Sequence, residues 1–155
     1  MHRTLGLVAL ILWVLTLTII GWFFVRGWTA SGSDGRTEII LAPSERDLVL
    51  KEMRELLKAV DRVIRELGSP QPDRQAAQAA ARAVGMAMAA DVNPAIMAKL
   101  PLSFKQIGMS IHQDMDALAD AIHQDETPQQ VLQRLGHMTA RCTACHDMYR
   151  FRTNE

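Results

Sequence analysis

Five residues close to the C-terminus restrict this chain more than any other feature. They are Cys142-Thr143-Ala144-Cys145-His146, a C-x-x-C-H motif that contains the only two cysteines of the 155 residues. On a helix, positions three and four apart share a face, so both thiols and the imidazole project to one side. This sequence pattern is the attachment motif of c-type haem, in which the two thiols bond to the porphyrin and the histidine binds the iron. The motif predicts one covalently bound haem c.

Other uses of the two cysteines are less consistent with the sequence. A thioredoxin-like pair is expected beside a βαβ unit, and no strand pattern surrounds Cys142 and Cys145. A structural zinc site needs four ligands, usually from two such pairs, and only one pair is present. A simple disulfide stays open, because the N-terminal sequence indicates export to an oxidising compartment.

An uncharged apolar segment near the N-terminus is the second strong signal. Leu5 to Val25 contains 21 residues without a charge, flanked by Arg3 and Arg26. This length spans a bilayer, whereas the apolar part of a signal peptide runs about 7–15 residues. Trp22 and the residues around it match an interfacial aromatic belt. We expect an uncleaved single-pass anchor in the bacterial inner membrane, with a cleaved export signal as the alternative. Haem c is attached outside that membrane, which places the following residues in the periplasm.

The chain after the anchor divides into a linker and one larger domain. Glycine, serine and aspartate cluster at residues 31–35 without apolar periodicity, which indicates a flexible segment. Pro43 ends a short apolar run at Ile39 to Leu41 that is long enough for a strand. We therefore expect an anchor at 1–28, a flexible linker at 29–43 and a haem domain at 44–155.

The haem domain is expected to be all-α, an antiparallel four-helix bundle. Apolar residues recur at helical spacing in the first helix, from a cap at Ser44 to a stop at Gly68. An alanine-rich second helix covers 73–90, with side chains small enough either for close packing or to leave room for a cofactor. The third helix carries its apolar face from Phe104 to Ile122. The fourth begins at Thr127-Pro128 and continues through the haem motif, whose cysteines extend its apolar side.

The domain resembles the cytochrome c prime family. The resemblance covers roughly residues 44 to 152, and its strongest part is the haem motif on the last helix followed by Tyr149-Arg150. It implies thioethers at Cys142 and Cys145 and an axial iron ligand at His146. It also implies that the sixth iron position faces the first helix, and that a homodimer through the first two helices is an option.

Three further residues are candidates for the haem site. Met53 lies in the middle of the first helix's apolar stripe, either as sixth ligand or as apolar lining beside a vacant iron position. His112 is a second candidate ligand, although a polar boundary role is commoner for such a histidine. Arg150 follows His146 by one helical turn, which places its cation near the haem or leaves it on the surface.

Two functions follow, and neither is enzymatic. The preferred one is electron transfer with membrane or periplasmic redox proteins, and the alternative is a five-coordinate haem module that binds nitric oxide or carbon monoxide. Peroxidase chemistry is disfavoured because no acid or base is identified on the first helix. Basic and acidic residues balance at 17 each, so nothing points to a nucleic acid.

Overall fold

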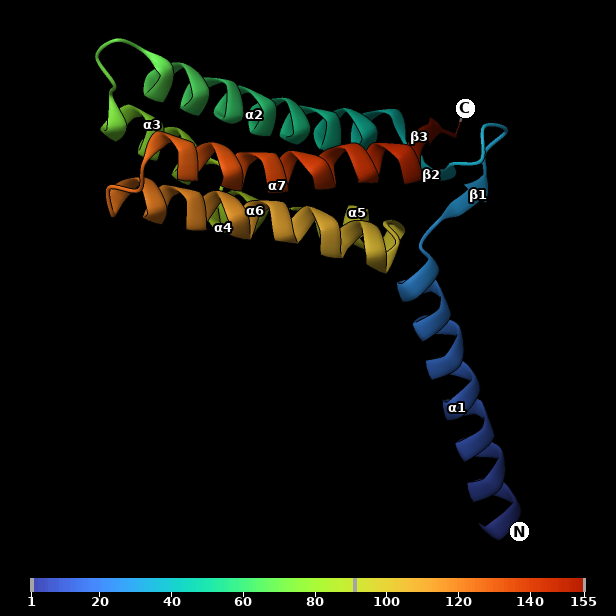
Figure 1. Cartoon of the computed structure of the whole chain (residues 1–155). Helices are drawn as coiled ribbons and strands as arrows, with labels where there is room; N and C mark the ends of the chain where they lie inside the picture. Colours follow the sequence, from blue (N-terminus) through green and yellow to red (C-terminus); the bar gives the residue numbers. More distant parts are fainter. Residues whose placement is uncertain (1, 91, 155) are drawn as a thin grey trace.

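A single long helix projects from one end of a helical bundle in the computed structural model (Figure 1). The structure describes residues 2–90 and 92–154, so the outer ends of the predicted domains, residues 1 and 155, lie outside it. Helix α1 covers His2–Arg26, and its apolar side chains are exposed. Its segment Thr4–Arg26 is long and apolar enough to cross a membrane.

The bundle has the four predicted helical regions, but the second region is interrupted and the first has a different N-cap. Its helices are α2 Pro43–Gly68, α3 Arg74–Ala83, α4 Met86–Ala89, α5 Pro94–Lys99, α6 Leu102–His123 and α7 Pro128–Met148. The predicted second helix is broken at Gly85 into α3 and α4. The predicted cap at Ser44 is wrong, because α2 begins at Pro43 and Glu45 accepts a hydrogen bond from the N–H of Ala42.

A small three-stranded sheet closes the end of the bundle from which α1 departs. Its strands are β1 Thr29–Ser31, β2 Thr37–Leu41 and β3 Tyr149–Thr153, in the order β1-β2-β3. Strands β1 and β2 are antiparallel, whereas β2 and β3 are parallel, with Ile39 opposite Phe151. Residues 29–43, expected to be a flexible linker, therefore contain two strands. The chain around Arg150, expected to continue the last helix, is the third.

The buried core of the described residues is divided in two. The larger cluster joins α2, α3, α6 and α7, and includes the buried Ala77 and Ala81 of α3. These alanines allow close helix packing, which is the simpler of the two roles expected for the alanine-rich segment. The smaller cluster joins β2, Val49 of α2, α5 with the following Leu100, and Phe104 of α6. The two cysteines lie at the division, with Cys142 packed against the larger cluster and Cys145 against the smaller.

Candidate haem site

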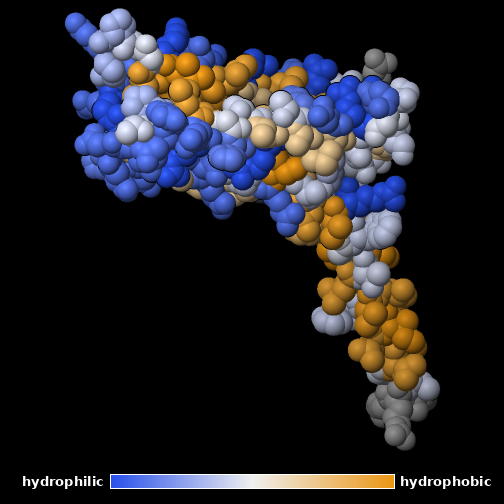
Figure 2. All heavy atoms as spheres, viewed as in Figure 1, coloured by the Kyte–Doolittle hydropathy of each residue, from blue (hydrophilic) through white to orange (hydrophobic). Residues whose placement is uncertain are grey.

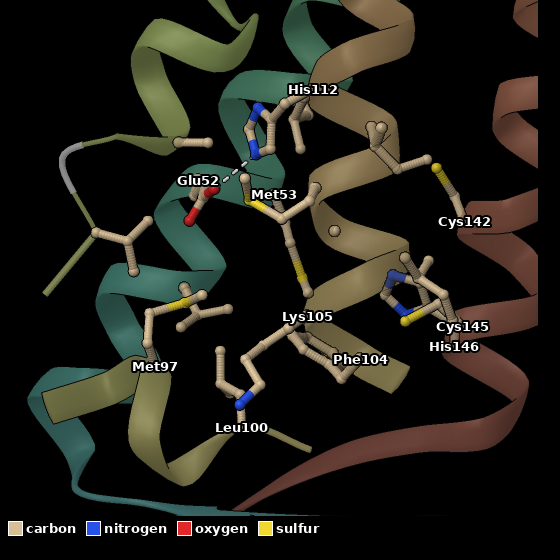
Figure 3. A pocket seen from close by; sticks show the side chains of 18 residues that line it. Glu52, Met53, Met97, Leu100, Phe104, Lys105, His112, Cys142, Cys145 and His146 are labelled. Atoms are coloured by element: carbon tan, nitrogen blue, oxygen red, sulfur yellow. Dashed lines mark hydrogen bonds and ion pairs between the residues drawn. The ribbon is translucent and has the colours of Figure 1, made fainter. Parts of the chain in front are cut away.

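A pocket lies where the core divides (Figure 3). The space between its walls is about 840 Å³, which includes the part that is open to solvent. Four parts of the chain form its wall, namely α2, the segment from Ala89 to Leu100, the first half of α6, and the end of α7. Most of the lining is apolar. A ligand in this space would contact both halves of the core at once.

The haem motif forms one side of this pocket. Cys142, Cys145 and His146 all line it, as expected for residues three and four apart on α7. Both cysteines are free, and the Sγ of Cys142 donates a weak hydrogen bond to the carbonyl of Met138 at 3.6 Å. Burial raises the pKa of both thiols, so they are protonated at neutral pH. Two thiols and an imidazole directed into one pocket fit a covalently attached haem.

Met53 lies in the same pocket on the side formed by α2. It is partly buried, and it also lines a smaller pocket with Cys145, His146 and Tyr149. In Figure 3 the cysteines and His146 stand on one side of the pocket, with Met53 and Glu52 toward the other. The position predicted for the sixth-ligand candidate is thus within the haem pocket, and the neighbouring residue Glu52 enters it as well.

Glu52 forms a hydrogen-bonded pair with His112 that the sequence did not reveal. His112 is 3% exposed; its Nδ1 bonds to the carbonyl of Val84 and its Nε2 to Oε1 of Glu52, each at 2.8 Å. A carbonyl only accepts, so Nδ1 carries a proton and the second proton is shared between Nε2 and the carboxyl group. Burial lowers the pKa of His112, but the bonds to Glu52 and Val84 outweigh it and leave this pKa raised.

The pair changes two expectations for the pocket. Both ring nitrogens of His112 are engaged, so iron ligation by this residue would break a buried hydrogen bond. The expectation that the helix facing the iron carries no acid or base is wrong, because Glu52 is on α2 and lines the pocket. Glu52 lies beside the apolar stripe of α2, and the sequence alone does not indicate its contact with His112 on α6.

Phe104 and Lys105 form the wall nearest the sheet. The Phe104 ring contacts those of Tyr149 and Phe151 edge to face, with centroids 5.5 and 5.8 Å apart. The hydroxyl groups of Ser103 and Tyr149 lie 2.5 Å apart. Lys105 is 8% exposed although it is charged, and burial lowers its pKa. Its ammonium is directed toward α1, a contact that no pattern within the helix itself could reveal.

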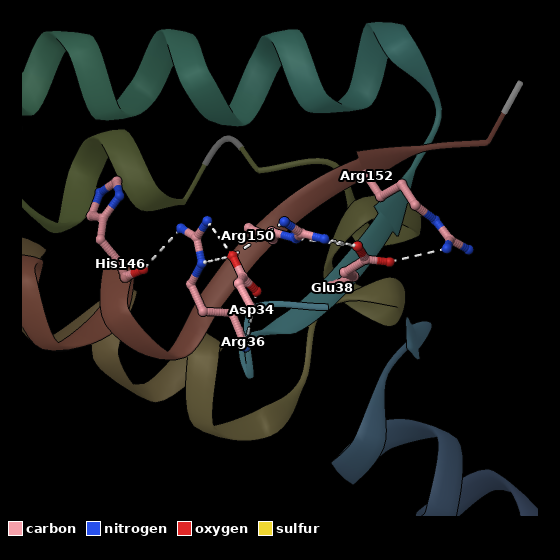
Figure 4. Close-up of polar contacts among 6 residues, drawn as sticks. All are labelled: Asp34, Arg36, Glu38, His146, Arg150 and Arg152. Carbon is pink, nitrogen blue, oxygen red and sulfur yellow. Dashed lines mark hydrogen bonds and ion pairs between the residues drawn. The ribbon is translucent and has the colours of Figure 1, made fainter. Parts of the chain in front are cut away.

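Arg150 lies on strand β3 rather than one helical turn beyond His146. Its guanidinium bonds to Glu38 through Nη2 at 2.5 Å and to Asp34 through Nη1 at 3.1 Å (Figure 4). Arg36 joins the same network and donates to the carbonyl of His146 at 3.4 Å. Aromatic and basic residues alternate in Tyr149-Arg150-Phe151-Arg152, a pattern typical of a strand. The prediction that Arg150 continues the last helix is therefore wrong. Arg150 still borders His146, in the smaller pocket.

Comparison with known proteins identifies the region around the motif. Residues 85–150 match a family model described as Cytochrome C', which takes in α4 to α7 and the haem motif but less than half of the chain. The comparisons with curated proteins and with solved structures gave no match.

Proposed function

We propose that this chain is a membrane-tethered periplasmic electron carrier of the cytochrome c prime family, a family that binds covalent c-type haem, because residues 85–150 match the model of that family. The observation that carries this proposal is the pocket that Met53 shares with Cys142, Cys145 and His146. A bound haem supplies a one-electron ferric–ferrous couple. The partners are membrane or periplasmic redox proteins, and no substrate is turned over.

The proposed roles of the residues follow from their places in the pocket. Cys142 and Cys145 form the thioethers, and His146 is the axial ligand. Met53, on the opposite helix, is the sixth ligand, and thioether ligation raises the reduction potential. The apolar side chains around Met53 exclude water. Glu52 and His112 are bound to each other, which supports a structural rather than an acid–base role for them.

The membrane tether is supported by the way the chain continues after α1. Trp28 donates its N–H to the carbonyl of Lys99 and accepts the N–H of Ile40, and strand β1 follows at once. Removal of the first thirty or so residues, as for a cleaved signal, would take away Trp28 and most of β1. An intact α1 is therefore the state that this fold favours.

The alternative is a five-coordinate haem module that binds nitric oxide or carbon monoxide. It is favoured by the apolar lining of the pocket, where Leu56, Met97 and Ile107 surround a space that suits a small uncharged ligand. In this case Met53 is lining rather than ligand.

Optical and electron paramagnetic resonance spectra of the purified protein, with and without carbon monoxide, separate the two. Electron transfer with Met53 ligation predicts a low-spin haem that does not respond to carbon monoxide. Met53→Ala then gives a high-spin ferrous form that binds it. Met97→Ala, which removes another methionine of the same pocket, is the matched control and leaves the spectra unchanged. A wild-type protein that binds carbon monoxide readily would contradict Met53 ligation and favour the gas-binding module.

A further inference from the structure

Helix α1 joins the bundle without a spacer. Gly27, directly after its last residue Arg26, has φ +66°, and a Cβ there would lie 2.7 Å from the carbonyl carbon of Leu100. The next residue, Trp28, donates its N–H to the carbonyl of Lys99 at 2.8 Å. The end of the apolar helix is therefore seated directly on the turn between α5 and α6.

Lys105 connects this joint to the haem pocket. Its Nζ donates to the carbonyl of Phe24 in the last turn of α1 at 3.1 Å, and it lies 3.9 Å from the centroid of the Phe24 ring. Lys105 is at the same time part of the pocket wall, as is Leu100 beside it. The side chain of Lys105 therefore links the pocket wall to α1.

The length of α1 places this joint at the membrane surface. Thr4–Arg26 has 23 residues, or about 35 Å of helix at 1.5 Å per residue, against a hydrocarbon core of about 30 Å. Its last turn therefore reaches the headgroup layer, and Lys105, which contacts that turn, lies at the same depth.

Aromatic and basic side chains surround the joint. Trp22 and Trp28 are 60% and 53% exposed. Arg26 lies 5.5 Å from the Trp22 ring, and the ammonium of Lys99 lies 5.8 Å from the Trp28 ring. Such rings with nearby cations are typical of the membrane–water interface. We call Trp22, Arg26, Trp28, Lys99 and Lys105 the collar. Figure 2 shows hydrophilic atoms where the apolar helix meets the bundle.

We propose that the collar is a membrane-docking surface that binds anionic phospholipid headgroups and holds the haem-pocket end of the bundle against the membrane. The proposal rests on the membrane anchoring proposed for α1. Of the three cations of the collar, Lys105 is buried against Phe24 and Lys99 pairs with Glu45. Arg26 is exposed and forms no ion pair with a carboxylate of the described residues, so it is the cation most accessible to a headgroup. The net charge of the collar is positive, which suits the phosphates of anionic lipids. Electron exchange then takes place with a partner in the membrane plane rather than one in the open periplasm.

Hydrogen–deuterium exchange of the full haem-loaded chain in lipid nanodiscs tests this docking. One nanodisc contains only zwitterionic phosphatidylcholine, and the other has a third of its lipid replaced by anionic phosphatidylglycerol. Amides of residues 94–105 are expected to exchange several-fold more slowly in the anionic nanodisc. Arg26→Gln and, separately, Lys99→Gln are expected to remove most of that difference.

Lys58→Gln is the matched control, because Lys58 is an exposed cation on α2 whose one ion-pair partner within residues 2–90 and 92–154 is Glu55. It should keep the lipid dependence. Equal exchange in the two nanodiscs, for a chain whose intact mass includes α1, overturns the docking and leaves the anchor in place. A reconstituted protein whose mass lacks α1 instead overturns the proposed anchor.

Discussion

Gly27 is the residue at which the apolar helix becomes part of the bundle. Two properties of glycine are needed there: a left-handed backbone, and the absence of a Cβ beside Lys99 and Leu100. A left-handed backbone costs a non-glycine residue about 1–3 kcal/mol. Any side chain at this position would in addition push α1 away from the turn between α5 and α6.

We expect Gly27→Ala to loosen the joint of α1 with the bundle. Amide exchange of the neighbouring strand Thr29–Ser31 should become faster than in the wild type. Gly35→Ala is the matched control, because Gly35 also has a positive φ, +85°, but has open space around it. Gly35→Ala therefore has the free-energy cost of a positive φ without a steric clash. Equal effects of the two substitutions on β1 would contradict a joint packed at Gly27.

The residues of the site differ in how well their positions could be predicted from the sequence. Cys142, Cys145 and His146 could be placed on one wall because their spacing alone fixes a common helix face. Met53 lies in the pocket, on the helix that the family resemblance expects to face the iron. Lys105 could not be foreseen, because its burial depends on the carbonyl and ring of Phe24, which belong to a distant helix.

Among the helices and strands, the break between α3 and α4 is the clearest difference between the predicted and the observed structure. Propensity favours one helix over residues 73–90, since alanine predominates. Asp116 of α6 competes with this, because its Oδ2 accepts the N–H of Met86 at 2.8 Å and its Oδ1 accepts from Arg82 at 2.9 Å. A Cβ on Gly85 would lie 2.7 Å from Oδ2 of Asp116 and still closer to Oδ1, so a side chain there would clash with the carboxylate. Gly85, which follows the C-cap Val84, and the tertiary hydrogen bond from Met86 to Asp116 together separate α3 from α4.

Asp116→Asn should therefore destabilise the bundle in a pH-dependent way. The N–H of Met86 and then Arg82 hold the pKa of Asp116 below its ordinary value of 3.8. The stabilisation is fully present above pH 3.8 and is lost as the pH falls through the lowered pKa of the folded state. Because the pair is partly exposed, we expect a loss of about 1 kcal/mol at neutral pH, which vanishes in acid.

Denaturant unfolding at several pH values measures this loss. Asp61→Asn is the control, because Asp61 forms an exposed ion pair with Arg65. Its removal should change the free energy of unfolding little at any pH. A difference between wild type and Asp116→Asn that stays constant down to strong acid would contradict the role given to the carboxylate.

Strand β3 shows why the sheet was only partly predictable. Ile39 to Leu41 could be assigned as a possible strand, since β-branched residues there precede Pro43. Its parallel partner at 149–153 lies at the far end of the chain, and although polar and aromatic residues alternate there, nothing in that pattern indicates pairing with residues 37–41. The network of Glu38 with Arg150 and Arg152 is likewise formed only when the two ends meet.

The bundle as a whole leaves an apolar surface on α2. Leu57 is 69% and Ile64 is 46% exposed, and both lie on one face of the helix. Figure 2 shows apolar atoms gathered over this part of the bundle. A surface of this kind favours association, and it agrees with the homodimer through the first two helices that the family resemblance implies.

We expect the detergent-solubilised protein to be a dimer that Leu57→Glu together with Ile64→Glu converts to a monomer. Two charges in the contact would remain unpaired and desolvated. Analytical ultracentrifugation measures the change. Leu48→Glu is the control, because Leu48 is equally exposed but lies on the opposite side of α2. A wild-type monomer would contradict the predicted contact.

The proposed molecule carries a covalent haem and an intact membrane helix, and each of them changes the mass of the protein. The most direct test is the intact mass of the protein purified from the membrane fraction of a host that attaches haem c. We predict the mass of the 155-residue chain plus one haem, and loss of the added mass when Cys142 and Cys145 are both replaced by alanine. A chain without covalent haem, or one found soluble and lacking α1, would contradict this account.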